Sequence, residues 1–318
     1  MAELTMADLK SSPDNYQSSR AVFDVLIGEE AALPLIEALS SSDNTTLQSM
    51  LMQPQWIKIV LSEPHCIYYQ SRTIDNENPV RSVGAMPMPT LKRAIIIAAR
   101  DGHAAAISTL LSFASEQGIK PMTVITRWVI DRAIINGHAA VFEAMASVDR
   151  KVVTFPLGHG NLPLIQAVKW GRTEVVAVLL RHGAKPPVTN EFSYASSLLF
   201  WSTTARGPRM TELLLKHGAS VTCSGALQSA SRQGALDTMR LLIQHGADVN
   251  EILPEDTLAR YYRPLYPNWT PMHFAASTGR VDAMKLLESN GARSAVKDGN
   301  GKTPAQLLEE YKNAHTDV

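Results

Sequence analysis

The amino-acid sequence predicts an all-α fold, a solenoid of about six to seven stacked helix–turn–helix units that carries two elongated finger loops. The first observation behind this prediction is a spaced series of glycines: Gly102, Gly137, Gly171, Gly207, Gly234 and Gly279. The second is a further glycine twelve residues after several of them, as in Gly234 and Gly246. Apolar residues at helical spacing, such as Met239 and Leu242, lie between the two glycines. Such units bury their apolar faces by stacking.

Each helix of a unit has its own start or stop signal. Thr270 and Thr303 each precede a proline, a combination that caps and then begins a first helix. The glycine in the middle of a unit can adopt a left-handed conformation, which ends that first helix. The second helix is expected to end at the His-Gly-Ala triplets that begin at His182, His217 and His245. These signals predict a helix pair for every unit.

These motifs resemble those of ankyrin-repeat proteins. They are Thr270-Pro-Met-His-Phe-Ala-Ala276, Gly246-Ala-Asp-Val-Asn250, Asp298-Gly-Asn-Gly-Lys-Thr-Pro304 and the Gly-His pairs at Gly102 and Gly137. The resemblance is strong from about residue 160 to 312, moderate from 90 to 150 and weak before 90. It implies repeats of about 33 residues. It also implies a concave groove that binds other proteins.

The sequence also predicts how the chain is divided. Its three segments are a polar lead (1–28), a single solenoid (29–312) and a disordered tail (313–318). Within the solenoid we expect a degenerate first unit (33–62), two insertions (62–89 and 251–269) and a capping helix (303–312). The first insertion reads as irregular, and Pro54 is expected to break or kink the second helix of the degenerate unit. The capping helix carries Glu309 and Lys312, which suit the exposed end of a stack.

The composition indicates which kinds of partner and which cellular compartment to expect. Thirty Lys and Arg residues balance thirty Asp and Glu residues, so bulk charge favours neither a nucleic acid nor a membrane as partner. Two cysteines, Cys66 and Cys223, are too few for a disulfide framework and favour a reducing compartment. The polar start resembles no signal peptide, and no apolar run is long enough for a membrane span. The expected location is the cytoplasm or the nucleus.

The finger loops supply most of the candidate binding residues. The second insertion concentrates rings and guanidinium groups, the side chains that dominate binding energy at protein interfaces: Arg260, Tyr261, Tyr262, Arg263 and Tyr266. The first insertion contributes Tyr68 and Tyr69. The tyrosines of a long loop can equally pack on the neighbouring repeat to keep the loop ordered. Trp269 begins a repeat and is expected to pack.

The first helices supply the remaining candidates. Alignment of the units places Trp170 and Arg232 at first-helix positions that face the groove in ankyrin stacks, and Asp131 and Arg132 belong to a polar cluster near another first helix. Trp170 is the sharpest of these signals, because stacking does not require an aromatic residue there. The histidines, by contrast, are explained by the repeat as hydrogen-bonding and helix-terminal residues.

Two functions from different classes remain. The leading interpretation is a module that binds a protein partner through the groove and the fingers. The alternative is a small-molecule site, or an enzyme without a cofactor, in the same groove with the insertions as walls and with Asp131 and His65 among its acid–base groups. We find no phosphate-binding loop, dinucleotide fingerprint, nucleophile elbow or metal-ligand spacing, so no cofactor, metal or catalytic residue is predicted.

Overall fold

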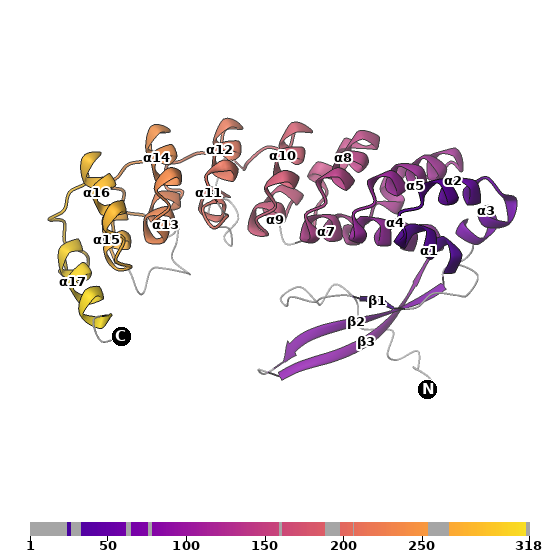
Figure 1. Cartoon of the computed structure of the whole chain (residues 1–318), viewed down its shortest axis with the longest axis horizontal. Coiled ribbons are helices and arrows are strands. Elements are labelled where there is room, and N and C mark those ends of the chain that lie inside the picture. The colour runs from indigo at the N-terminus through magenta and orange to yellow at the C-terminus, as the bar shows by residue number, and fades with distance from the viewer. Residues whose placement is uncertain are drawn as a thin grey trace. The chain divides into compact units, whose positions relative to one another are not determined.

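The structure is a computed structural model of the chain (Figure 1). It describes residues 24–26, 33–61, 65–75, 78–158, 161–187, 198–205, 207–253 and 267–315, with the backbone alone in the strands. The chain forms two compact units, Met1–Val152 and Val153–Val318. We describe each unit by itself, and a single continuous solenoid over 29–312 stays a prediction.

The first unit contains three stacked helix pairs. Its helices are α1 (Leu33–Ser40), α2 (Asn44–Leu51), α3 (Pro54–Leu61), α4 (Thr90–Asp101), α5 (Ala104–Glu116), α6 (Pro121–Val124), α7 (Arg127–Asn136) and α8 (Ala139–Val148), and a 3₁₀ turn, η4 (Arg150–Thr154), begins at its end. The first helices α1, α4 and α7 pack in one row, and the second helices α2, α5 and α8 pack in another. Pro54 ends the second helix of the first pair as expected, because the chain restarts there as α3.

The first insertion is a β-hairpin, so the prediction of an irregular loop over 62–89 was wrong. Strands β2 (His65–Asp75) and β3 (Asn78–Met88) pair antiparallel along their full length. A third strand, β1 (Asp24–Leu26), pairs with Gln70 to Tyr68 of β2, so the polar lead over 1–28 also contributes structure. The sheet order is β1-β2-β3. Pro79 and Pro87 within β3 are breaker residues that hid this strand in the sequence.

The second unit contains four stacked helix pairs and a terminal helix. Its helices are α9 (Pro163–Lys169), α10 (Thr173–Arg181), α11 (Leu198–Ser202), α12 (Arg209–Lys216), α13 (Ala226–Gln233), α14 (Leu236–Gln244), α15 (Pro271–Ala276), α16 (Val281–Ser289) and α17 (Pro304–Ala314). The first helices α9, α11, α13 and α15 form one row, which α17 continues. With the three pairs of the first unit, these pairs confirm the predicted solenoid of helix–turn–helix units.

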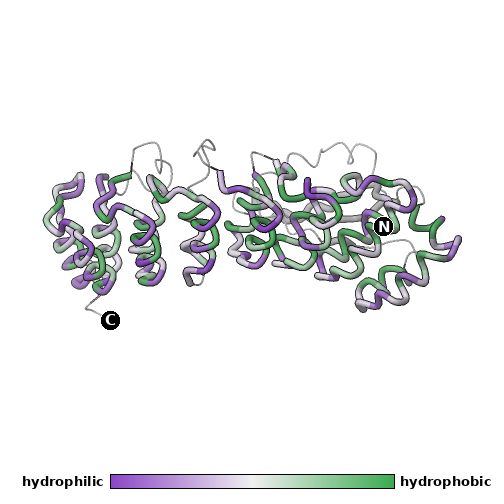
Figure 2. Tube along the Cα trace, turned by 90° about the horizontal axis from the view of Figure 1, so that it is seen from above, coloured by the Kyte–Doolittle hydropathy of each residue, from purple (hydrophilic) through white to green (hydrophobic). Residues whose placement is uncertain are grey.

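Second helices such as α10 and α14 bury one side, whereas first helices such as α4 and α15 are buried over most of their length. Apolar and polar residues alternate along the helices of both units (Figure 2). In the second unit, Trp269, Phe274 and Leu307 form a buried cluster between α15 and α17. Helix α17 therefore covers an apolar surface that α15 could not bury alone, which is the role of a capping helix.

The ends of the helices follow the predicted signals. Gly102 and Gly137 end α4 and α7 in the left-handed conformation, with φ of 87° and 78°. Thr270 and Thr303 each form a capping box at the start of a helix. The predicted capping helix 303–312 extends two residues further in the structure, because α17 begins at Pro304 and continues through Ala314, which shortens the tail predicted from 313. Residues 316–318 lie outside the described residues.

Candidate functional site

The base of the second finger is held by hydrogen bonds to the first helices. The carboxylate of Glu251 accepts a hydrogen bond from the backbone N–H of Cys223 at 2.7 Å and another from Gln228 Nε2 at 3.2 Å. At the other end of the insertion, the Trp269 indole is buried and donates to Asp298 Oδ2 at 3.0 Å. Trp269 therefore packs as predicted. The remaining candidates of this finger lie outside the described residues: Arg260, Tyr261, Tyr262, Arg263 and Tyr266.

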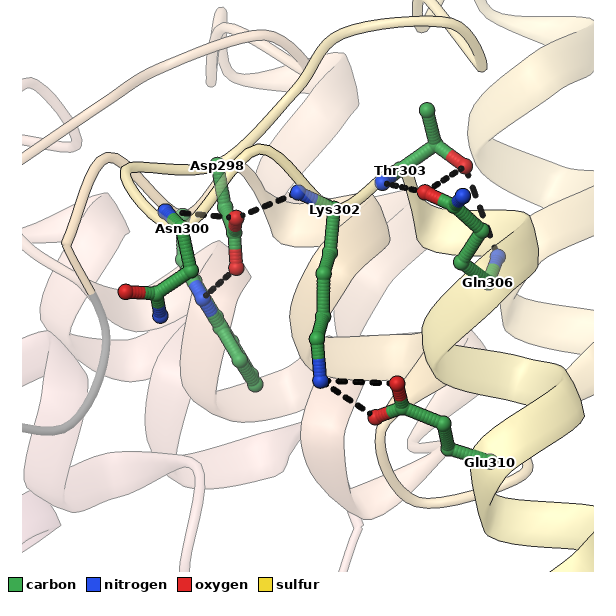
Figure 3. A network of polar contacts seen from close by, with 7 residues as sticks. Asp298, Asn300, Lys302, Thr303, Gln306 and Glu310 are labelled. Atoms are coloured by element: carbon green, nitrogen blue, oxygen red, sulfur yellow. Dashed lines mark hydrogen bonds and ion pairs between the residues drawn. The ribbon is translucent and has the colours of Figure 1, made fainter.

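The network around Asp298 connects this finger to the last helix. Asp298 Oδ1 accepts hydrogen bonds from the backbone N–H groups of Asn300 and Lys302, while its Oδ2 accepts the Trp269 indole N–H (Figure 3). Lys302 Nζ lies 2.7 Å from Glu310 Oε1 (Figure 3). The network fixes the turn between α16 and α17, and every group in it has a structural partner.

Tyr68 and Tyr69 belong to a strand and not to an irregular finger. Both lie in β2, where Tyr68 pairs with Ala85 and Tyr69 with Gly84. Successive residues of a strand lie on opposite faces of its sheet. The two positions therefore belong to different faces of the sheet.

Asp131 is held by an ion pair inside the first unit. Its Oδ2 lies 3.3 Å from Arg127 Nε, one helical turn earlier on α7. Burial raises the pKa of Asp131, and the charge and hydrogen bond of Arg127 lower it in part. Arg132 is half-buried beside it. Arg127 and Asp131 are thus in contact, and Arg127 offsets only part of the effect of burial on the carboxylate.

The turn that follows α4 uses its polar groups for stacking. Arg100 and Asp101 form an ion pair at 2.6 Å. The carbonyl of Arg100 accepts hydrogen bonds from Asn136 Nδ2 and from the His138 ring nitrogen Nε2, each at 2.8 Å. Because a carbonyl can only accept a hydrogen bond, this contact requires His138 to carry a proton on Nε2. The first helices α4 and α7 therefore lie side by side, with their carboxyl ends together.

Trp170 is the most exposed aromatic candidate on the first helices of the second unit. It follows directly after α9, and 43% of its surface is exposed. Its neighbour Lys169 is half-buried, and burial lowers the pKa of that amine. Arg232 is exposed near the end of α13, and its carbonyl accepts a hydrogen bond from Thr278 Oγ1 at 2.9 Å. Trp170 and Arg232 occupy the same end of two helices in one row.

Sequence reasoning missed a row of hydroxyl and amide groups between α11 and α13. Thr203 Oγ1 lies 2.7 Å from Ser229 Oγ, and Gln233 Nε2 donates to both side chains. Ser202 Oγ lies 2.8 Å from Thr211 Oγ1 in the same pair of repeats. The sequence signal for this row was serine and threonine at positions that usually hold alanine. Small polar residues are also common in loops, so this signal did not identify the row.

The histidines are structural in the repeats where they are described. His273 is fully buried, and its Nδ1 accepts a hydrogen bond from the backbone N–H of Thr270 at 3.2 Å. His103 Nδ1 lies 2.7 Å from Ser42 Oγ, and both His217 and His245 contact a carbonyl in the preceding helical turn. The described residues contain no group of three or more His, Cys, Asp or Glu side chains that could hold a metal ion. Within the same residues, every helix is too short or too polar to cross a membrane.

Two segments of the second unit match family models of ankyrin repeats. One match, to a single repeat, covers residues 159–191, and the other, to multiple repeats, covers residues 227–288. Both segments carry the stacked helix pairs and the turn glycines described above. These two segments are ankyrin repeats.

Curated ankyrin-repeat proteins are similar over part of the chain. Human cyclin-dependent kinase inhibitor 2A is 29% identical over 155 residues, which are 49% of this chain and 71% of the relative. Human protein phosphatase 1 regulatory subunit 27 is 32% identical over 88 residues, covering 27% of this chain and 49% of the relative. Ankyrin repeat protein nuc-2 of Neurospora crassa is 27% identical over 173 residues, but these span only 15% of its length.

Solved ankyrin-repeat structures share the fold. The ankyrin-repeat domain of human ASB11 superimposes with a TM-score of 0.53 at 23% sequence identity, covering 69% of this chain and 96% of that domain. At this level of identity the likeness establishes the fold alone.

Proposed function

We propose that this ankyrin-repeat protein is a protein-binding module that recognises its partner through the first-helix row of the second unit. The similar proteins support the general class, because two of them are named for inhibiting a kinase and regulating a phosphatase. The finer proposal assigns the contacts to Trp170 and Arg232 on these helices. It includes the second finger, with Arg260, Tyr261, Tyr262, Arg263 and Tyr266.

The exposed ring of Trp170 carries this proposal. Tryptophan and arginine are enriched among the residues that supply most of the binding energy of protein interfaces. A repeat stack needs no aromatic residue at the end of a first helix, since Gln233 and Thr278 occupy the corresponding positions of α13 and α15. An indole that is 43% exposed in the folded protein loses water contact only when a partner covers it.

The test compares Trp170→Ala with Val281→Ala. Val281 opens α16 on the row of second helices and is 40% exposed, so the two substitutions remove similarly exposed apolar groups from different surfaces. Proteins captured from cell extract by the wild-type chain are quantified by mass spectrometry, and the affinity of each candidate is then measured with purified components. Trp170→Ala should weaken the binding of a true partner by about 2 kcal/mol. Val281→Ala should leave the binding free energy unchanged.

Equal capture by both variants would exclude the Trp170 surface. Thermal unfolding supplies the control, because both exposed substitutions should leave the melting temperature within about 2 °C of the wild type. Arg263→Ala and Tyr262→Ala extend the test to the second finger. If either variant lowers the melting temperature strongly, the finger stabilises the fold, and its residues are then excluded from the proposed contacts.

The location and the alternative function are also proposals. Two cysteines in 318 residues suit a reducing compartment, so we propose the cytoplasm or the nucleus. The alternative of a small-molecule pocket or a cofactor-independent enzyme requires insertions that wall the groove, and residues 254–266 lie outside the described part. Of its acid–base candidates, Asp131 is already paired with Arg127. We therefore prefer the binding module.

A further inference from the structure

Helix α4 begins without a cap in a buried environment. Its N-cap residue is Pro89, and no side chain caps the helix. Thr90 and Leu91 in the first turn are only 4% and 2% exposed. The first N–H groups of a helix have no acceptor within the helix, and a buried end without partners is unfavourable. The first-turn amides of α4 therefore have no side-chain cap.

Arg93 brings a buried positive charge to the same end of the helix. Its side chain is 7% exposed, and its Nε is buried without a hydrogen-bond partner. Arg93 lies within the first turn and a half of α4, and side chains on an α-helix lean toward its N-terminus, so a side chain at this position can reach the first turn. Burial lowers the pKa of Arg93, the effect expected of a charge that no neighbour offsets. Among the described residues, no ion pair involves Arg93, although a buried guanidinium without a counter-charge strongly destabilises a fold.

The surrounding helices supply more positive than negative charge. Lys92 is the half-buried neighbour of Arg93 on α4, and α3, which packs on α4, carries Lys58 and no acid. Glu37, exposed on α1, is the one acidic residue of α1, α3 and α6. On α7, the one acid is Asp131, which is paired with Arg127. Helix α5, which also packs on α4, carries Glu116 at its exposed carboxyl end. Among the described residues, none of these acids forms an ion pair with Arg93.

The neighbouring first helix adds an unsatisfied hydroxyl. Helix α7 begins after Thr126, whose side chain caps nothing and whose Oγ1 is buried without a partner. The hydrogen bonds from Asn136 and His138 to the carbonyl of Arg100 hold the carboxyl ends of α4 and α7 together. The amino ends of these two helices, of 12 and 10 residues, accordingly lie on one side of the unit. Two buried side-chain groups without a hydrogen-bond partner, Arg93 Nε and Thr126 Oγ1, therefore belong to this side of the unit.

We propose that the amino-terminal end of α4 is a binding site for a phosphate group, held by Arg93 and by the first-turn amides of the helix. A guanidinium presents a planar fork of N–H donors that matches two oxygens of a phosphate, and a helix N-terminus favours negative charge. Lys92 contributes a second positive charge for a dianion. The site belongs to the first unit and is independent of the protein-binding surface proposed for the second. Inorganic phosphate and a phosphate monoester share this chemistry.

The experiment measures binding of inorganic phosphate to the full chain by titration calorimetry, with sodium chloride at matched ionic strength as the reference. Arg93→Met should weaken phosphate binding at least tenfold, and Arg93→Lys, which keeps a point charge without the fork, should weaken it less. Lys285→Met removes an exposed charge from α16 of the second unit and should change the affinity less than twofold. Phenyl phosphate distinguishes the two sources: equal affinity indicates a monoester, and much weaker affinity indicates the free ion.

A second measurement separates a ligand site from a structural role. In phosphate-free buffer, Arg93→Met should unfold at the same or a higher temperature than the wild type, because it removes an unpaired buried charge. Added phosphate should then raise the melting temperature of the wild type and leave that of Arg93→Met unchanged. A lower melting temperature of Arg93→Met without phosphate would show that Arg93 already has a partner. That result, or equal stabilisation of both proteins by phosphate, overturns the proposal, as does wild-type binding no stronger than to chloride.

Discussion

Gly279 is a residue at which the repeat turn cannot accept a side chain. Its φ is +68°, and a Cβ at this position would overlap the ring of Tyr311 on α17. Gly291 has a similar φ of +88° but has open space around the same position. Alanine at either site should cost about 1 kcal/mol for the left-handed backbone, and Gly279→Ala should cost about 1–3 kcal/mol more from overlap. Urea unfolding of both variants checks this, and equal losses would mean that Tyr311 moves aside.

The sequence identified single residues where local chemistry decides their role. The turn glycines, Thr270 and Thr303 were predicted correctly because each acts on its own helix end. The contact of Tyr311 with Gly279 joins residues 32 positions apart and follows only from the stacking of α17 on α15. The buried charge of Arg93 was missed for the same reason, since a lysine–arginine pair near a helix start usually faces solvent.

At the scale of one element, α15 depends on a neutral histidine. His273 Nδ1 accepts the backbone N–H of Thr270, and its Nε2 lies 3.3 Å from the carbonyl of Lys302. Burial lowers the pKa of His273 from its ordinary 6.5. The unfolded chain therefore binds a proton near that pH while the folded protein does not. The free energy of unfolding should fall as the pH drops below 6.5, by at most about 1.4 kcal/mol per pH unit, until the pH reaches the folded pKa.

The substitution His273→Gln tests the source of this pH dependence. Glutamine already serves at the same capping-box position of α17, as Gln306, so it can keep an acceptor for the N-cap amide without titrating. Urea unfolding between pH 7.5 and pH 5 should give a flatter profile for His273→Gln than for the wild type. His245→Gln, on an exposed histidine, should keep the wild-type profile. Parallel profiles for all three proteins would place the titration elsewhere.

The helices were predictable as elements, whereas the hairpin was not. Helical spacing and Gly or Pro signals recur in every unit, so α13, α15 and α17 fall close to where the sequence indicated them. The strands β2 and β3 gain their structure from pairing with each other, and nothing in β3 alone outweighs its two prolines and Gly84. The candidate site was predictable only in part, since Trp170 and Asp131 lie on regular helices while the Tyr-rich finger follows no repeat.

At the scale of the molecule, the division into two units has a measurable consequence. The unit from Val153 to Val318 holds its own buried clusters, including Trp269, Phe274 and Leu307 beneath α17. Leu307→Ala should lower the free energy of unfolding of this unit by about 2–3 kcal/mol. The loss should be the same in the full chain and in a protein shortened to residues 153–318, measured by urea unfolding. Failure of the shortened protein to unfold cooperatively would show that this unit does not fold alone. The regular repeat continues through this boundary in the sequence, so the division was not predictable.

The prolines of β3 also affect how the protein behaves at high concentration. Pro79 and Pro87 are eight residues apart in one strand, so their missing N–H groups lie on the same edge of it. Proline occurs in a sheet where its nitrogen faces away from the neighbouring strand, which places both on the edge away from β2. Arg81, Val83 and Ala85 alone keep outward donors between them. An edge with so few outward donors is a poor template for cross-β association, so we expect this 11-residue strand to resist edge-to-edge pairing.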